Sequence, residues 1–327
     1  MTISKINLWK WCLLFVVTFF TLCSFIAISF SPELIFVQCD VGQGDAILIR
    51  QRSIDIVIDT GYQGYGIIEC LDRYMPFWDQ TIELVILSHF DLDHVGGFKE
   101  VMSHFDVLHV MIGATIFDTG LGTNELELIS SYIEQKYSNL LVVRSGDSFQ
   151  LDDLSISILW PMITAEQRSL MSDYGFIDQD IFQKIVNNHS AFGIANDIDE
   201  NDGSIVAEIT FKDFSVLLTG DISSDIEDFL VHELLIHSNF DIFKVSHHGS
   251  LSSSSPSFIR YINPMIASIG VGDNRYGHPH PDVISRLLKH SNYVCRTDMS
   301  GDIVIEYSQG LFTLNNSTDC LTPVFGD

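Results

Sequence analysis

The sequence predicts an α/β protein in which two β-sheets pack face to face with helices on their outer faces, behind one apolar N-terminal helix. Three observations support this prediction. Short apolar runs separated by turn residues form two successive groups, each followed by helical patterns, which is typical of two packed sheets. The length of 327 residues is enough for one large domain or two ordinary ones. Finally, a long stretch near the N-terminus carries no charge.

The N-terminal stretch predicts a membrane anchor. Residues 11–30 (WCLLFVVTFFTLCSFIAISF) are uncharged, and about 20 apolar residues span a bilayer as a helix. Lys5 and Lys10 precede the stretch and the next basic residue is Arg50, so the positive-inside rule places the N-terminus in the cytoplasm and the rest outside. Residues 27–29 (AIS) resemble a signal-peptide cleavage site, so a cleaved signal with a secreted or periplasmic product is the alternative.

The first group of strands follows the apolar stretch. The runs LIFVQCDV, AILIR, IDIVIDTG, TIELVILS and VLHVMIG are short and apolar, and turn residues such as GQG separate the earlier ones. Apolar residues at helical spacing predict helices between and after the later strands. These helices are expected at residues 67–75, 96–105 and 124–136.

The second group comprises LLVVR, DSFQL and LSISILWP, then IVAEITF, FSVLLTGD, FDIFKVSHHGS and MIASIGV. Helices are predicted at residues 222–235 and 281–290, and a last hairpin at 301–314. Residues 163–202 show no regular pattern and are predicted to form either a loop over a site or an insertion.

The charge of the chain limits its partners. The sequence has 43 acidic and 17 basic residues, a formal net charge of −26. Such a surface repels nucleic acid and other polyanions, so an anionic substrate must be held by a local device such as a metal ion or a small basic patch.

The cysteines form no CxxC pair. Cys39, Cys70, Cys295 and Cys320 lie outside the apolar stretch, and their spacing alone does not determine a pairing. We expect them to be buried thiols in preference to disulfides, although an exported chain could bridge some of them.

Four metal-capable side chains occur within SHFDLDHVGG, after a predicted strand. A divalent metal ion needs oxygen or nitrogen ligands that converge from several segments. His89, Asp91 and Asp93 are two residues apart, and alternate residues of an extended segment point the same way, so these three can converge. His94 can then face a second ion. The loop therefore predicts a site for two metal ions.

Two ions about 3.5–4 Å apart need a shared carboxylate and further ligands. LLTGD supplies Asp221 at one strand end, and KVSHHGS supplies His247 and His248 at another. Three clusters at strand ends of a two-sheet protein indicate one rim. This convergence favours a catalytic metal site over isolated core or surface histidines.

These motifs carry a family resemblance. SHFDLDHVGG, IDTG, LLTGD and KVSHHGS resemble the metallo-β-lactamase superfamily. More narrowly, DVGQGDAILI, NDGSIV, KVSHHGS and GDNRYGHP are similar to the hydrolase domain of the ComEC family of DNA-internalisation competence proteins. The resemblance covers residues 35–304 and implies a four-layer αββα metallo-β-lactamase sandwich at residues 32–327, behind the predicted anchor at residues 1–31.

The resemblance also implies metal-binding roles. The implied ligands are His89 and Asp91 for the first ion, Asp93, His94 and His247 for the second, and Asp221 as the bridge. Asp91 stands where the superfamily loop HxHxDH has a histidine, and a carboxylate-rich site suits Mn²⁺ as well as Zn²⁺. Supporting residues behind the ligands are Asp59, Asp45 and Asp202, the last in the segment NDGS that replaces the usual third-motif histidine.

Catalytic and substrate-binding residues follow from the same resemblance. Asp93 and His278 would be catalytic, with His278 contacting a phosphate or protonating the leaving oxygen. The implied substrate-binding residues are Lys244, His248, Tyr276 and His278, although Lys244 could equally be packed or solvated. Two ions would lower the pKa of a shared water and yield hydroxide near neutral pH. His189 matches no motif and receives no role.

Together these features predict a metal-dependent hydrolase, foremost a phosphodiesterase or nuclease related to DNA uptake. Its expected partners are DNA or a small phosphodiester and a competence channel, with the anchor in the inner (cytoplasmic) membrane and the catalytic domain outside. The net charge argues against DNA, and one apolar stretch cannot itself form a channel. The alternatives are a hydrolase of a small nucleotide, lactone or lactam, and a non-catalytic metal-binding accessory protein.

Overall fold

The computed structural model describes residues 8–62, 64–114, 138–162 and 199–323, together with 129, 131–133, 135 and 136. The chain divides into two compact units, residues 1–33 and 34–327. Most of the predicted helix 124–136 lies outside the described residues, as do residues 163–198 with His189.

The first unit contains one helix, α1 (Leu8–Phe30). In the part of the chain that the structure describes, no helix meets both the length and the apolar character needed to cross a membrane. The anchor at residues 11–30 therefore stays a prediction.

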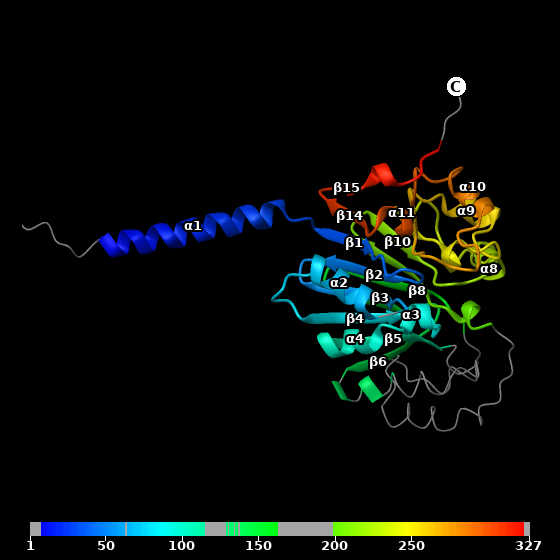
Figure 1. Cartoon of the computed structure of the whole chain (residues 1–327), viewed down its shortest axis with the longest axis horizontal. Helices are drawn as coiled ribbons and strands as arrows, with labels where there is room; N and C mark the ends of the chain where they lie inside the picture. Colours follow the sequence, from blue (N-terminus) through cyan, green and yellow to red (C-terminus); the bar gives the residue numbers. More distant parts are fainter. Residues whose placement is uncertain are drawn as a thin grey trace, which may run out of the picture. The chain divides into compact units, whose positions relative to one another are not determined.

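The second unit contains two sheets (Figure 1). The first has eight strands in the order β15-β14-β1-β2-β3-β4-β5-β6. Their bounds are β1 (Leu34–Gln38), β2 (Ala46–Gln51), β3 (Ile54–Thr60), β4 (Thr81–Leu87), β5 (Asp106–Gly113), β6 (Asn139–Val143), β14 (Ile303–Ser308) and β15 (Leu311–Leu314). Strands β3 to β6 are parallel, whereas β1 pairs antiparallel with both β2 and β14.

The second sheet has seven strands in the order β13-β12-β11-β10-β9-β8-β7. Their bounds are β7 (Ser148–Leu151), β8 (Leu154–Trp160), β9 (Val206–Phe211), β10 (Phe214–Leu218), β11 (Ile242–Lys244), β12 (Ile266–Ile269) and β13 (Tyr293–Arg296). Strands β10 to β13 are parallel. Each sheet therefore contains a parallel part whose strands end at one edge.

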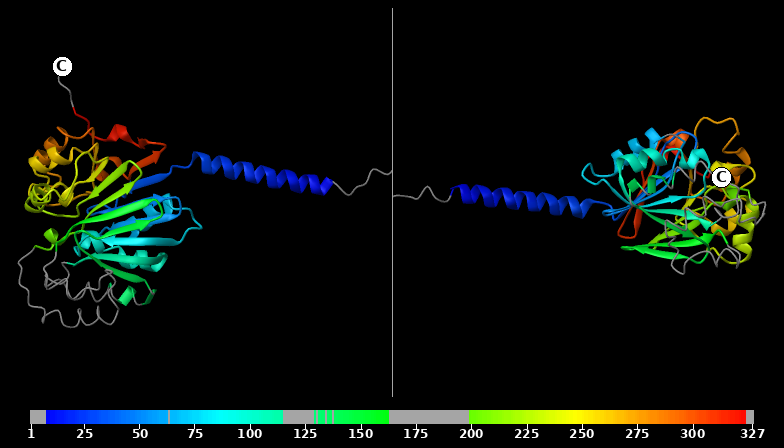
Figure 2. Two further views of the ribbon diagram at one scale, coloured as in Figure 1. Left: turned by 180° about the vertical axis from the view of Figure 1, so that it is seen from behind. Right: turned by 90° about the horizontal axis from the view of Figure 1, so that it is seen from below.

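The buried side chains form three clusters that define the layers. The central cluster joins the inner faces of the two sheets and includes Phe36, Ile56 and Val216. The outer clusters pack α2 (Gly64–Tyr74) and α4 (Phe98–His104) on the first sheet, and α8 (Ser224–His232), α9 (Pro256–Ile262) and α10 (Pro281–Leu287) on the second. Figures 1 and 2 show α8, α9 and α10 grouped together, away from α2 and α4. The predicted two-sheet sandwich with outer helices is confirmed.

The sequence missed two elements of the second half. No helix was predicted between residues 250 and 265, but Ser255 accepts a hydrogen bond from the Phe258 N–H and Pro256 follows it, so α9 begins there. Strand β13 was also missed because its run of four residues is too short to show a period.

The prediction that these four cysteines are buried free thiols is wrong. Cys39 forms a disulfide with Cys70, and Cys295 forms one with Cys320. The first bond joins the end of β1 to α2, and the second joins β13 to the segment after β15. Spacing could not show these pairs because the partners are 31 and 25 residues apart and meet only through the tertiary fold.

Candidate functional site

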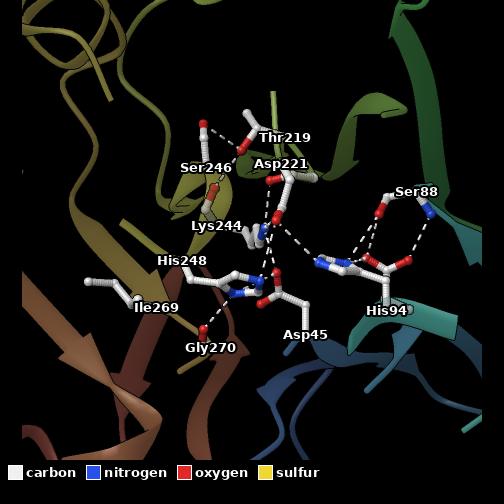
Figure 3. A network of polar contacts seen from close by, with 12 residues as sticks. Asp45, Ser88, His94, Thr219, Asp221, Lys244, Ser246, His248, Ile269 and Gly270 are labelled. Carbon is white, nitrogen blue, oxygen red and sulfur yellow. Dashed lines mark hydrogen bonds and ion pairs between the residues drawn. The ribbon is translucent and has the colours of Figure 1, made fainter. Parts of the chain in front are cut away.

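The site lies where parallel strands of both sheets end. Strand β4 is followed by residues 88–97, which we call the metal loop. Strand β10 is followed by Asp221, and β11 is followed by the segment 246–250. Figure 3 shows that His94, from the first sheet, faces Asp221 and His248, from the second. Residues far apart in the sequence therefore meet at one rim.

The metal loop becomes helical earlier than the sequence predicted. The short helix α3 (Leu92–Val95) begins after Asp91, whose carbonyl accepts the His94 N–H at 2.9 Å. The predicted extended alternation therefore extends only to His89 and Asp91, whose Nε2 and Oδ2 atoms are 3.7 Å apart. Asp93 and His94 lie on the helix and face the second sheet instead.

Asp59 holds His94 in one orientation. The Nδ1 of His94 donates to Asp59 Oδ2 at 2.8 Å, and Asp59 also accepts from the Ser88 N–H and hydroxyl, both at 2.7 Å. A buried histidine held through Nδ1 presents Nε2 to its other side. Asp59 thus lies where the resemblance places a bracing residue.

Asp221 occupies the centre of the cluster. Its Oδ2 is 3.4 Å from His94 Nε2 and 3.3 Å from His248 Nε2 (Figure 3). The Nδ1 of His248 donates to the Gly270 carbonyl at 2.8 Å, which turns Nε2 toward Asp221 and toward Asp93 Oδ2 at 3.2 Å. The geometry therefore places Asp221 between two histidines, as expected of a bridging carboxylate.

The structure brings His248, rather than His247, to the carboxylates. Both residues have left-handed backbone conformations, with φ of 49° and 50°, which cost about 1–2 kcal/mol each for a residue with a side chain. This backbone separates the two side chains, so His247 lines the pocket beside His278, at 5.4 Å between ring centroids. A strand-end histidine pair gives no sign in the sequence of which member turns inward.

Lys244 does not reach the pocket. Its side chain is 2% exposed, and its ammonium lies 2.5 Å from Asp45 Oδ2 and 3.1 Å from Asp221 Oδ1, while donating to the Gly220 carbonyl at 2.6 Å. The substrate-binding role predicted for Lys244 is therefore wrong in this structure, because the cation is buried behind Asp221. It neutralises two buried carboxylates instead.

The DVGQGD turn supports the metal loop from behind. The Asp45 N–H donates to the Asp93 carbonyl at 3.1 Å, and Gln38 donates to Asp45 Oδ1 at 2.9 Å. At Gly44 a Cβ atom would lie 2.2 Å from the same Asp93 carbonyl oxygen, so only glycine permits this approach. Asp45 thus has the supporting position that was predicted for it.

Asp202 supports the chain after Asp221 and lies away from the ligands. It lies in the short helix η3 (Asn201–Gly203), and its Oδ1 accepts the Ser223 N–H at 2.8 Å. Sequence reasoning missed Ser204 in the same segment, whose hydroxyl accepts the Asp221 N–H at 3.1 Å. The NDGS motif therefore fixes the backbone at Asp221 and two residues after it.

Burial and neighbouring charges have opposite effects on the pKa of Asp221 in this cluster. Burial disfavours the ionised form of Asp221, but His248, Lys244 and His94 outweigh it and hold the Asp221 pKa well below its usual range. In His247 and His278, burial is the dominant effect and lowers the pKa of both imidazoles. Two neutral imidazoles therefore face the pocket near neutral pH.

A pocket of about 630 Å³ opens in front of the cluster. Its described lining is Gln43, Tyr62, Asp91, Leu92, Asp93, Asp221, His247, His248, Asp273, Tyr276 and His278. Among these described residues there is no lysine or arginine. The carboxamide of Asn274 accepts the backbone N–H groups of Tyr276 and His278 and donates to the His278 carbonyl, which holds the YGHP loop at the rim. Both predicted rim residues, Tyr276 and His278, thus line the pocket.

The donor set fits divalent cations. The Nε2 atoms of His89, His94 and His248 are buried and form no hydrogen bond to any described residue. Ligand atoms of Asp45, His94, Asp221 and His248 all lie within 4.8 Å of one another. Since Asp45 is already paired with Lys244, the available ligands are imidazoles and carboxylates of the other residues. Buried imidazole nitrogens beside carboxylates suit Zn²⁺ and Mn²⁺.

Comparison with known proteins supports the two-sheet fold and the resemblance to the metallo-β-lactamase superfamily. A profile of the Metallo-beta-lactamase superfamily matches residues 39–120. Over 84% of its length the chain resembles a mutant of the CmlA β-hydroxylase, with a TM-score of 0.50, 13% sequence identity and coverage of 54% of that chain. At this identity the likeness concerns the fold alone.

Three curated relatives are competence or recombination proteins. The chain is 25% identical to ComE operon protein 3 of Bacillus subtilis (84% of this chain, 33% of the relative) and 25% identical to Recombination protein 2 of Haemophilus influenzae (87% and 30%). It is 24% identical to Competence protein ComA of Neisseria gonorrhoeae (83% and 32%). The resemblance to ComEC-like competence proteins is confirmed, and the chain spans about a third of the length of these relatives.

Proposed function

We propose that the chain is a metal-dependent phosphodiesterase related to DNA uptake. The observation that carries this proposal is the convergence of three buried imidazole Nε2 atoms, on His89, His94 and His248, on the carboxylates of the rim. The competence-protein relatives favour a phosphodiester substrate over a lactam or lactone. Two metal ions, Zn²⁺ or Mn²⁺, are the proposed cofactors.

Each ligand has a proposed position in this site. His89 and Asp91 hold the first ion, Asp93, His94 and His248 hold the second, and Asp221 lies between them. His248 replaces the His247 of the sequence prediction because its Nε2 faces both carboxylates. When bound, such ions activate water and neutralise charge on phosphoryl oxygens. Asp59 and the Gly270 carbonyl keep the two inward-facing imidazoles in their ligating orientation.

His278 is proposed to contact the substrate phosphate or to protonate the leaving oxygen, and the second role uses the minor fraction that is protonated at neutral pH because burial lowers its pKa. Its Nδ1 is buried and forms no hydrogen bond to any described residue, and its side chain lines the pocket together with Asp91 and Asp93. A group within reach of the leaving oxygen can donate a proton as the ester bond breaks. Its neighbour His247 can accept a hydrogen bond from the same part of the substrate. Tyr276 offers an exposed ring beside His278 at the entrance of the pocket.

The pocket restricts how much negative charge the substrate can bring. Four aspartates line it, and none of its described lining residues is lysine or arginine. A long polyanion would therefore be held mainly through its scissile phosphate. A small phosphodiester such as a nucleotide is the second candidate substrate, and the net charge of −26 favours it.

We also propose an extracytoplasmic location, with residues 11–30 as an inner-membrane anchor and residues 32–327 outside. Two disulfides support this location, because such bonds persist in oxidising compartments. A competence channel, supplied by another protein, would be the partner of a nuclease in this position.

The test uses the purified full chain loaded with Mn²⁺ or Zn²⁺. Single-stranded DNA, double-stranded DNA and bis-p-nitrophenyl phosphate are assayed side by side, with Asp221→Ala as the inactive control. Metal-dependent cleavage of DNA supports the uptake-related nuclease, and cleavage of the small diester alone moves the substrate to a small molecule. No cleavage of any of the three by the metal-loaded chain would refute the phosphodiesterase.

A further inference from the structure

A buried carboxyl group lies behind the segment that carries His247 and His248. Glu227, on α8, is 0% exposed, and within the described part of the chain its carboxyl group makes its hydrogen bonds to this segment and its continuation. Its Oε1 lies 2.8 Å from the Ser246 hydroxyl and accepts the Ser254 N–H at 2.8 Å, and its Oε2 accepts the Ser255 N–H at 2.8 Å. One side chain thus contacts both ends of residues 246–255.

The segment needs such support because its backbone is strained. His247 and His248 both have positive φ, which residues with side chains rarely adopt. Without tertiary contacts the chain would relax, and a change of tens of degrees at His248 would turn its Nε2 away from Asp221. The hydroxyl of Ser246, directly before the strained pair, is the link to Glu227.

Counting hydrogens extends this link to Thr219, directly after β10, and to the Lys244 carbonyl on β11. The Thr219 hydroxyl donates its single hydrogen to the Lys244 carbonyl at 2.8 Å, so it can only accept from the Ser246 hydroxyl, 3.0 Å away (Figure 3). The Ser246 hydroxyl likewise has one hydrogen but faces both Thr219 and Glu227. A protonated Glu227 completes the chain, because it donates to Ser246, Ser246 to Thr219 and Thr219 to the Lys244 carbonyl.

The neutral form is also the one that burial favours. Burial raises the pKa of the Glu227 carboxyl to about 7. The resulting chain of hydrogen bonds connects α8 with the strand ends that carry Asp221 and His248. None of its members lines the pocket among the described residues.

We propose, on the basis of the proposed function, that Glu227 is a positioning residue for the metal site, acting through Ser246 on the His247-His248 backbone. It holds the ligands of the second ion in place without touching ion or substrate. The expected consequence of its loss is weaker metal binding, beyond what a loss of fold stability produces.

The experiment compares Glu227→Ala with Leu230→Ala in the full chain. Leu230 lies on the same helix and is 0% exposed, but packs only in the apolar cluster, so its truncation destabilises α8 without touching the polar chain. The readout is the dissociation constant for Mn²⁺ alone, measured by titration calorimetry below the melting temperature of each variant.

We expect Glu227→Ala to raise the Mn²⁺ dissociation constant about ten- to hundredfold, as for other residues that orient metal ligands. Glu227→Gln should fall between wild type and Ala, because an amide can donate to Ser246 but loses one backbone acceptor. Leu230→Ala should stay within about twofold of wild type. A dissociation constant for Glu227→Ala within twofold of wild type, or an equal rise in Leu230→Ala, would overturn the proposal.

Ser246→Ala keeps the test decisive if Glu227→Ala does not fold. It removes only the link to the histidines, so the Mn²⁺ dissociation constant should rise several-fold, and an unchanged value refutes the proposal. Diester cleavage is measured on the same samples. A wild type that binds Mn²⁺ but cleaves nothing refutes the proposed function alone, whereas a wild type that binds no Mn²⁺ refutes both.

Discussion

Replacement of Lys244 by methionine should destabilise the metal-free protein strongly. The ammonium contacts two buried carboxylates, at 2.5 Å from Asp45 and 3.1 Å from Asp221. Methionine fills similar space without charge, so Lys244→Met leaves Asp45 buried without its cation and leaves Asp221 with only His94 and His248 beside it. Removing one partner of a buried ion pair costs about 3–5 kcal/mol.

The effect can be measured by thermal unfolding in excess EDTA, where no metal ion can replace the lost charge. At about 2–4 °C per kcal/mol for a domain of this size, 3–5 kcal/mol corresponds to a fall of about 6–20 °C in the melting temperature. The double variant Lys244→Met/Asp45→Asn should regain part of this loss, because it removes the Asp45 charge that the ammonium no longer compensates. Lys289→Met, at an exposed lysine, is the matched control and should change little.

A fall of less than about 2 °C in Lys244→Met would refute this reasoning, as would a double variant no more stable than the single one. Either result would mean that the ammonium is not what keeps the two carboxylates buried. Added Mn²⁺ should raise the melting temperature of Lys244→Met more than that of the wild type if the ion takes over part of the compensation.

Four further predictions follow from the same structure. Loss of the Cys39–Cys70 disulfide in the double alanine variant should cost about 3–4 kcal/mol of unfolding free energy in urea, for a loop of 31 residues; an unchanged midpoint contradicts this. Burial raises the Glu227 pKa from 4.5 to about 7, so the native state holds this proton more tightly than the unfolded chain. The unfolding free energy should therefore fall by about 3 kcal/mol more between pH 4.5 and 7 in wild type than in Glu227→Gln, with no difference in slope above that window. His278→Ala should lower diester turnover about 10²–10⁴-fold with unchanged metal content by mass spectrometry; loss of metal would instead make His278 a ligand. Asp221→Ala should abolish metal binding and turnover while circular dichroism stays native, and full metal content in this variant would exclude a bridging role.

Much of the fold could be predicted because its elements carry local signals. Strands such as β4 and β10 are continuous apolar runs that end at polar motifs, so their positions and their common rim follow from pattern alone. The first residues of α9 and the whole of β13 could not be predicted in this way. Their formation depends on a serine cap and on pairing with β12, and neither leaves a periodic trace.

The candidate site was predictable in composition but less so in detail. The sequence identifies which segments carry His94 and Asp221, because spacing and residue type suffice for that. It does not indicate that His248 turns inward, since this depends on the left-handed backbone at residues 247 and 248. Nor does it show that Lys244 is buried, because a strand residue faces inward or outward according to a register that only pairing with β10 and β12 determines.

The pairing of β1 with β14 has a consequence for the order of events during synthesis. Leu34 lies opposite Tyr307, so β1, which can pair with β2 early, gains its second neighbour only after residues 303–308 have been synthesised. Contacts between residues so distant in sequence are slow to form, and the incomplete chain meanwhile exposes an unpaired strand edge. Completion of the first sheet is therefore a late step of folding, because it requires that β14 and β15 have already been synthesised.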